Sequence, residues 1–416
     1  MSLLKYLLRF LFVNYSMMQK FIPVYSKLSV GLIFLCSSVL AVAQNFIPGN
    51  TYIDATGYVE YRAGNLPIVI SAPHGGYLEP STIPDRSCTG CVTGRDSFTQ
   101  EVSDGVYNSI FTETGCYPHL IINLLHRKKF DANRDVQDAA DGDPTVIQTW
   151  TNYHNFIDVA KAQVVQDYGT GTFYDMHGHG HSIQRIELGY LLTRTELQQT
   201  DNYINTNTGT QDTSIRTLVN SNLQNLTQAQ LIRGSSSFGD ILENRGYHTV
   251  PSSLDPAPQG TESYFAGGYN TRRHGSSDNI SPISAIQIEM NSNIRFNSAN
   301  RATLIDSLAV SILDYHGINY NSQFANQYCG VLNNDEILPH KKTSIFPNPS
   351  SDIITFISIE SIKSYVVYDA LGKVVLNNSN SNNQVDISKL KSGMYFLILQ
   401  AENGSKETIK FVKANG

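Results

Sequence analysis

Charged side chains are scarce in this chain of 416 residues, because Asp, Glu, Lys and Arg together make up only 16% of it. Soluble proteins typically reach about 25%. The 36 acidic residues outnumber the 30 basic ones, which gives a formal net charge of −6. Without a basic excess the chain has no positive field for a phosphate backbone, so we expect no nucleic-acid partner. The hydrophobic fraction of 41% and the length predict two or three domains with ample cores.

A long apolar run is also missing near the N-terminus, where the run 28–42 is shorter than the about 20 residues of a membrane span. This run follows two lysines and ends in the small residues Ala-Val-Ala, which is the pattern of a secretory signal. We therefore predict a signal peptide region at 1–43, with the true start at Met17 or Met18. The mature chain would begin at Gln44.

Cysteine is rare, and Cys36 would leave with the signal. The four that remain are Cys88, Cys91, Cys116 and Cys329. An even number in an oxidising compartment favours disulfides, and three pairings are open. Cys88 and Cys91 form a CxxC step without a second CxxC to complete a zinc ribbon, so we favour a disulfide there.

Strand-like and helix-like runs alternate from the end of the signal to residue 320, which predicts an α/β domain over 44–320. The expected strands are 66–72, 119–125, 172–177, 186–192 and 284–290. The expected helices are 97–112, 145–168, 212–225 and 301–315. Several strands are continuously apolar, so the sheet should carry helices on both faces. The polar segment 321–342 has little periodicity and predicts a linker.

The last part of the chain, 343–416, consists of short alternating runs separated by Asn, Ser and Gly, which predicts a small all-β sandwich. Its most specific sequence motifs are IFPNP, VVYDALGK, LKSGMY and KFVK. Together they resemble the C-terminal sorting domain of the type IX secretion system. The resemblance implies secretion or cell-surface display through the outer membrane, with that machinery as a partner. A carbohydrate-binding sandwich would share the strand rhythm, but this segment has no Trp to stack on sugars.

Three polar sequence motifs stand at the ends of expected strands, where open α/β sheets place their ligand-binding sites. They are PHGG at 73–76, DMHGHGH at 175–181 and IQIEMN at 286–291. If the second strand continued, its aspartate and three histidines would lie on one face. Imidazole and carboxylate ligands with one open position suit a catalytic Zn²⁺. No HExxH motif is present, which excludes the zincin pattern.

These motifs belong to a longer series along the chain: PHGG, GRDSFTQEVSDGV, HRKKFDANRD, DMHGH, FAGGYNTRRHG and IQIEMN. The series resembles the N-formylglutamate amidohydrolase family, a relative of the zinc carboxypeptidases, over 68–296. The resemblance implies a phosphorylase/hydrolase-like mixed sheet with helices on both faces and one Zn²⁺ ion. Its ligands would be His74, Asp96 and His177, with Glu101 as the alternative to Asp96.

The same resemblance implies catalytic roles around the metal. Glu289 would act as general base on water and then as acid toward the departing amine, because burial brings its pKa toward the working pH. Arg127 would stabilise the developing oxyanion. Asp175 would orient His177 or a neighbouring residue without binding the metal itself. His179 and His181 follow His177 in the chain. Each is either an alternative metal ligand or a residue that lines the entrance of the site.

Substrate contacts are implied at Asn133, Arg134 and Arg272. The guanidinium fork of Arg134 suits a substrate carboxylate better than a lysine would. The expected disulfide between Cys88 and Cys91 would hold the loop that carries the acidic ligand. His126 and His274 are candidates for lining the site, without an assigned role.

These observations predict a secreted zinc-dependent amidohydrolase for a small carboxylate-bearing substrate, N-formylglutamate-like or an acylated amino acid. The alternative is a carboxypeptidase-like metallopeptidase for peptides or cell-wall fragments, since the pocket beside Arg134 and Arg272 decides between them. A third hypothesis is a metal-free surface binding protein on the same fold. The joint presence of His74, Asp96, His177 and Glu289 argues against it.

Overall fold

The structure is a computed structural model that describes residues 46–207, 212–277, 281–320, 343–358, 361–370, 372–378, 383–402, 404 and 406–414. The predicted signal region 1–43 and the predicted linker 321–342 lie outside the described residues, and so does Cys329. Within the described part, no helix combines the length and the apolar character that crossing a membrane requires.

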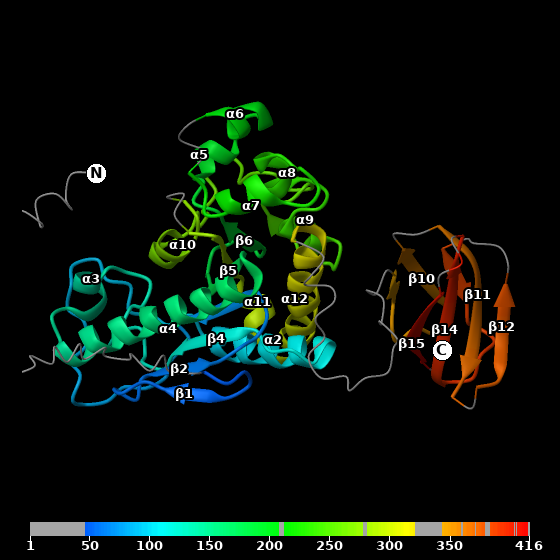
Figure 1. The fold of residues 1–416 in the computed structure, drawn as a ribbon, viewed down its shortest axis with the longest axis horizontal. Helices are drawn as coiled ribbons and strands as arrows, with labels where there is room; N and C mark the ends of the chain where they lie inside the picture. The colour runs from blue at the N-terminus through cyan, green and yellow to red at the C-terminus, as the bar shows by residue number, and fades with distance from the viewer. Residues whose placement is uncertain are drawn as a thin grey trace, which may run out of the picture. The chain divides into compact units, whose positions relative to one another are not determined.

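An eight-stranded mixed sheet forms the centre of the α/β region (Figure 1). Its strands are β1 (Thr51–Ile53), β2 (Val59–Arg62), β3 (Ile68–Ala72), β4 (His119–Asn123), β5 (Gly171–Gly178), β6 (Ile186–Gly189), β7 (Thr249–Val250) and β8 (Ile283–Met290). Their order in the sheet is β1-β2-β4-β3-β5-β8-β6-β7. The central strands β4, β3, β5 and β8 are parallel, whereas β2 and β6 flank them in antiparallel pairing. The sheet is therefore mixed, as the sequence predicts.

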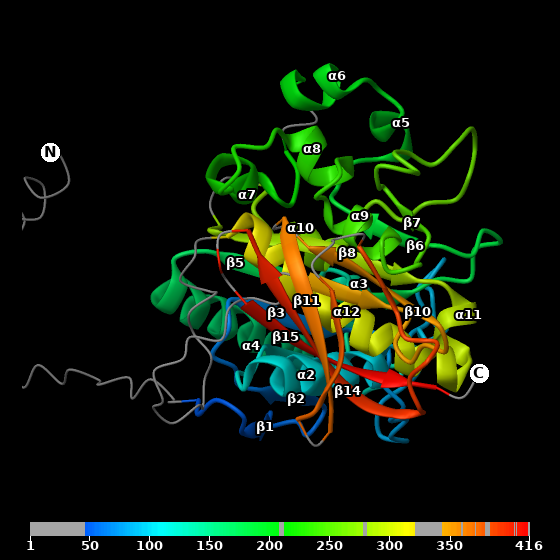
Figure 2. The same ribbon diagram turned by 90° about the vertical axis from the view of Figure 1, so that its right-hand side faces the viewer.

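Long helices cover both faces of the sheet, with α2 (Thr99–Thr114) and α12 (Ser298–Asn319) on one face and α4 (Pro144–Tyr168) on the other (Figures 1 and 2). The shorter helices are α3 (Val136–Ala140), α5 (Arg194–Leu197), α6 (Asp201–Thr206), α7 (Arg216–Ser221), α8 (Gln228–Arg233), α9 (Phe238–Glu243), α10 (Tyr269–His274) and α11 (Ser292–Phe296). The start of α4 is fixed locally, because the Asp143 carboxylate accepts two N–H groups of its first turn and a proline occupies its first position.

Two apolar cores form because successive side chains of a strand point to opposite faces. Ile68 and Ile70 of β3 enter the core under α2 and α12, while Val69 enters the core under α4. Fully burying each such side chain contributes roughly 1.5–3 kcal/mol. The continuous apolar runs of the central strands thus follow from burial on both faces.

The expected helix over 212–225 is wrong in extent, since only α7 forms there. Asn222 ends it by leaving the helical conformation, with φ −67° and ψ 145°. Its side-chain amide donates to the Leu218 carbonyl, and its side-chain oxygen accepts the N–H of Leu226. A local side-chain alternative to helical hydrogen bonds stops the helix here.

Two expected strands also end early, since the strand expected over 119–125 stops at Asn123 and the one expected over 186–192 is also shorter. The strand expected over 186–192 stops at Gly189, because Leu191 adopts a left-handed conformation with φ +67°. The strand expected over 172–177 ends as β5 at Gly178. The strand therefore does not continue far enough to place His179 and His181 on one face with His177, since both follow the strand end.

The C-terminal region folds as two antiparallel sheets around a core of its own. One sheet contains β9 (Thr343–Phe346), β10 (Ile353–Ser358) and β13 (Gln384–Asp386). The other contains β11 (Ile362–Asp369), β12 (Val374–Asn378), β14 (Gly393–Ala401) and β15 (Lys406–Lys413). Phe356 of the first sheet and Val367, Leu397 and Phe411 of the second share this core. This is the small antiparallel sandwich that the sequence predicts.

Candidate metal centre

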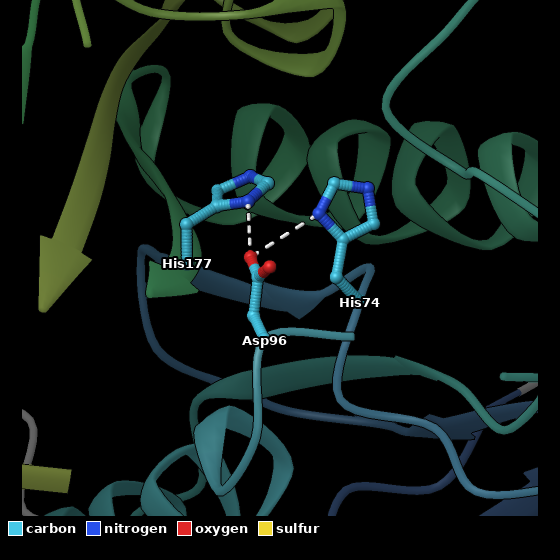
Figure 3. A group of neighbouring side chains, drawn as sticks. All are labelled: His74, Asp96 and His177. Carbon is cyan, nitrogen blue, oxygen red and sulfur yellow. Dashed lines mark hydrogen bonds and ion pairs between the residues drawn. The ribbon is translucent and has the colours of Figure 1, made fainter. Parts of the chain in front are cut away.

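Three buried side chains from distant parts of the chain meet at the carboxyl end of the parallel strands (Figure 3). His74 follows β3, His177 lies near the end of the neighbouring strand β5, and Asp96 precedes α2. Asp96 Oδ2 is 3.3 Å from His74 Nδ1 and 3.2 Å from His177 Nδ1. Their exposed fractions are only 1%, 8% and 2% for His74, Asp96 and His177. The three ligand atoms are close enough to share one ion.

Each histidine has a second carboxylate behind it. His74 Nε2 lies 2.6 Å from Asp131 Oδ1, and His177 Nε2 lies 2.8 Å from Asp175 Oδ2. Because a carboxylate only accepts, each Nε2 donates its hydrogen outward, and Nδ1, once it has lost any proton shared with Asp96, would offer its lone pair to an ion bound beside Asp96. This carboxylate–histidine arrangement is typical of metal ligands. Two lone pairs and a carboxylate oxygen that converge on one point suit a divalent ion such as Zn²⁺.

The carboxylates of the centre keep their charge in spite of burial. Burial alone would raise the pKa of Asp96, but the two neighbouring imidazoles outweigh it and hold the pKa well below its usual range. Burial also opposes ionisation of Asp131, and His74 together with Arg127 lowers its pKa below the ordinary value. The centre is therefore rich in negative charge that a cation would balance.

Glu289 lies beside the centre in a row that crosses three strands. His177 on β5 is the register partner of Glu289 on β8, which in turn faces Glu187 on β6. Gln287 donates to Glu289 Oε1 at 3.0 Å, whereas the buried Oε2 has no hydrogen-bond partner among the described residues. Burial raises the pKa of Glu289 to about 8, since the charges of Asp96 and Glu187 offset the effect of His177. This side chain is placed to exchange a proton with a bound molecule.

Arg127 and Asn133 also reach the centre. Arg127 donates to the second oxygen of Asp96 at 3.1 Å and to Asp131 at 3.0 Å. The Asn133 side-chain amide lies 3.4 Å from His177 Nε2, and its oxygen accepts the N–H of Asn270 at 2.7 Å. Arg127 thus contacts the ligand Asp96 and the carboxylate behind His74, whereas the Asn133 side chain contacts the ligand His177.

The remaining expected site residues lie further out. Arg134 is half-buried and donates to the carbonyl of Asn133, and Arg272 on α10 is exposed, with its guanidinium 3.9 Å from Asp212. Glu101 on α2 accepts a hydrogen bond from the Tyr77 hydroxyl. Glu101 is not among the residues whose ligand atoms cluster with the histidines, whereas Asp96 is.

Sequence reasoning missed Asp131, although this residue lies within the motif HRKKFDANRD. A carboxylate four residues after an arginine is usually interpreted as a surface ion pair. Only its complete burial and its contact with His74 distinguish it. Two carboxylates behind two histidines are a signal that sequence alone does not give.

Arg295 was missed as well, and it connects the segments that hold the centre. Its guanidinium donates to the carbonyls of Met290 at 2.9 Å, His179 at 3.1 Å and Ser97. Met290 directly follows Glu289, and Ser97 directly follows Asp96. His179 lies two residues after His177. A side chain at Gly178 would collide with this guanidinium. Arg295 therefore fixes three loop segments relative to one another.

Cys88 and Cys91 form a disulfide, which confirms the prediction for this pair. The neighbouring Arg86 is buried and donates to the carbonyls of Val92 at 2.6 Å and Arg127 at 3.1 Å. The disulfide turn is thereby attached to the segment that surrounds the centre.

The described residues thus define an α/β region with a histidine–carboxylate centre and a C-terminal β-sandwich. Residues 344–414 match the family of secretion system C-terminal sorting domains. This segment is a type IX sorting domain, so the chain interacts with the type IX secretion machinery and is exported to the outer membrane or cell surface.

The comparison with curated proteins gives no significant match. Among solved structures, the chain is similar to PorZ, a surface component of the type IX secretion system of Porphyromonas gingivalis, at 15% identity and a TM-score of 0.17. That match covers 18% of this chain and only 12% of PorZ. A gene product of Agrobacterium tumefaciens is similar at 12% identity and a TM-score of 0.38, covering 64% of this chain and 98% of that one. A candidate carboxypeptidase A of Shewanella denitrificans is similar at 11% identity and a TM-score of 0.31, covering 66% of each chain.

Proposed function

We propose that the α/β region is a zinc-dependent amidohydrolase, exported to the cell surface, that cleaves an amide or formamide bond in a small carboxylate-bearing substrate. One observation carries this proposal: His74 and His177 both direct Nδ1 at Asp96 while their Nε2 atoms bind buried carboxylates. The unpartnered oxygen of Glu289 on the next strand adds the proton acceptor that hydrolysis requires.

Zn²⁺ held by His74, Asp96 and His177 would supply a Lewis acid for the scissile carbonyl and a more acidic water. Glu289 Oε2 accepts a proton from a water molecule while the oxygen of that water bonds to the carbonyl carbon. The carbon–nitrogen bond then breaks, and Glu289 returns the proton to the departing nitrogen. Gln287 holds the other oxygen of Glu289 in place during both transfers.

The chain's own residues also keep the ligands in position. Asp131 and Asp175 fix the ring orientation of the two histidines, and Arg127 binds the oxygen of Asp96 that faces away from them. The centre is thereby preorganised before substrate arrives.

A second candidate function is a metallopeptidase for longer substrates, and exposed aromatic side chains favour it. Phe265 is 44% exposed and donates its N–H to Glu187, the neighbour of Glu289. Phe296 is 57% exposed and packs edge to face against Phe98, two residues after Asp96. Apolar surface on two sides of the centre would bind parts of a substrate beyond the scissile bond.

The test is metal analysis and hydrolysis with the chain from Gln44 onward. We expect about one Zn²⁺ at this centre, lost in His177→Ala and kept in His126→Ala, a control at a half-buried histidine outside the ligand cluster. Formyl- and acyl-amino acids should be cleaved faster than short peptides, and the reverse order would select the metallopeptidase. A parent protein whose hydrolysis survives complete chelation would overturn both candidates.

A further inference from the structure

A second cluster of metal-ligating side chains lies one strand away from the centre. His179, His181 and Glu187 each offer a ligand atom, and these atoms lie within 4.8 Å of one another. His179 and His181 stand in the turn after β5, and Glu187 is the second residue of β6. The proposed amidohydrolase reaction does not use any of them.

The hydrogen bonds of His179 define which of its nitrogens is available. Nε2 lies 2.8 Å from the Arg185 carbonyl, and since a carbonyl only accepts, Nε2 carries the hydrogen. Nδ1 then carries the lone pair, which accepts the backbone N–H of His181 at 3.1 Å and would exchange this hydrogen bond for a bound metal ion. A histidine whose other N–H is bound to a backbone carbonyl is arranged as metal ligands are.

His181 and Glu187 supply the other two ligand atoms. His181 Nδ1 lies 3.0 Å from Glu187 Oε1, a separation that either a shared proton or a shared metal ion can bridge. The second oxygen of Glu187 accepts the N–H of Phe265 at 2.9 Å, which turns Oε1 toward the histidine. His181 is half-buried and stacks on exposed Phe265, so the cluster keeps a side open to solvent.

The charges around the cluster favour a cation. Glu187 is fully buried, and the nearest guanidinium, that of Arg185, has its Nε 3.9 Å from Oε1. The Nη1 of Arg185 is already bound to Asp255 at 3.1 Å and Glu262 at 2.8 Å. Three carboxylates therefore share one arginine, and Glu289 faces Glu187 from the next strand. A buried carboxylate in such a setting needs further positive charge.

We propose that His179, His181 and Glu187 form a second metal site, which binds a divalent transition metal such as Zn²⁺. Two imidazoles and one carboxylate with an open position are a ligand set that Zn²⁺ accepts, whereas Mg²⁺ and Ca²⁺ prefer oxygen ligands. Glu289 lies between the two sites, because its register partners are His177 on one side and Glu187 on the other. A bound ion would also reduce the repulsion between Glu187 and Glu289.

The experiment is a Zn²⁺ titration of the metal-free chain from Gln44 onward, followed by metal analysis after removal of unbound ion. We expect two ions per chain in the parent and one in His181→Gln and in Glu187→Gln. The double variant His177→Ala/His181→Gln should retain none. His248→Gln, at a largely exposed histidine 3.2 Å from Asp255, is the control that should keep two.

Circular dichroism of each metal-free variant shows whether it has folded, and Glu187→Gln and His181→Gln give independent tests of the same site. An unchanged ion count in both folded variants would overturn the second site and leave a proton between His181 and Glu187. If the count falls in these variants but does not change in His177→Ala, the second site stands and the proposed zinc centre of the hydrolase fails.

Discussion

The Asp131→Asn variant removes one charge from behind His74 while leaving the side chain almost the same size. Asparagine still offers an oxygen to the Nε2–H group of His74, which lies 2.6 Å from Asp131 in the parent. The uncharged oxygen no longer makes the imidazole more basic, so its Nδ1 becomes a weaker ligand. We expect the affinity for Zn²⁺ to fall about 10–100-fold, or about 1.4–2.7 kcal/mol in binding free energy.

The contacts of Asp131 indicate a loss toward the upper end of that range. Its carboxylate also accepts from Arg127 Nε at 3.0 Å and lies 3.7 Å from Arg86. With that charge removed, the positive charge of Arg127 acts more strongly on Asp96, its other partner. A ligand that is drawn toward an arginine donates less electron density to a metal ion.

The assay is competition for Zn²⁺ between the protein and a chelator of known affinity. Asp175→Asn should show a loss of similar size, because Asp175 stands behind His177 in the same way. Asp158→Asn is the matched control, since this carboxylate faces His274 and contacts neither ligand. Equal affinity in the parent, Asp131→Asn and Asp175→Asn would refute the reasoning, and so would an equal loss in the control.

Three further predictions concern other parts of the α/β region. Glu289→Gln should retain Zn²⁺ and lower kcat/KM by about 100-fold or more, because the amide cannot take up the proton; steady-state kinetics on the best substrate of the screen would check this, and unchanged kinetics would exclude the role. Arg295→Met should destabilise the fold by about 3 kcal/mol in urea unfolding, because three carbonyls lose their donor, whereas Arg295→Lys should lose less. Burial lowers the pKa of His119 in the folded protein to about 3, whereas the unfolded chain keeps a value of about 6.5. Because only the unfolded state takes up this proton between these values, the free energy of unfolding decreases as the pH falls below about 6.5. His119→Gln should remove about 2 kcal/mol of the stability difference between pH 7 and pH 5, and an identical pH dependence in both proteins would contradict this origin.

The strands and long helices of the α/β region were predictable because burial imposes a strong pattern. β3, β5 and β8 are buried on both faces, and α4 begins at a proline preceded by a capping aspartate. The ends of elements were not predictable in the same way. Asn222 stops α7 through its own side chain, and such a choice depends on competition between local hydrogen bonds.

The candidate centre was predictable to the extent that its residues stand in distinct words at strand ends. His74, Asp96 and His177 do lie together, but Asp131 and Arg295 required the structure. Which carboxylate lies behind which histidine depends on how strands align across the sheet. Strand register is set by pairing between distant segments, and a single sequence does not record it.

The contact between Gly178 and Arg295 has an evolutionary consequence. The guanidinium occupies the space that any side chain at position 178 would need, so these two positions are not free to vary independently. In related proteins, alanine or serine at 178 should occur only with a smaller residue at 295. The two positions would then change together over time, and a protein that acquired only the first change would lose the connection among the three segments around its centre.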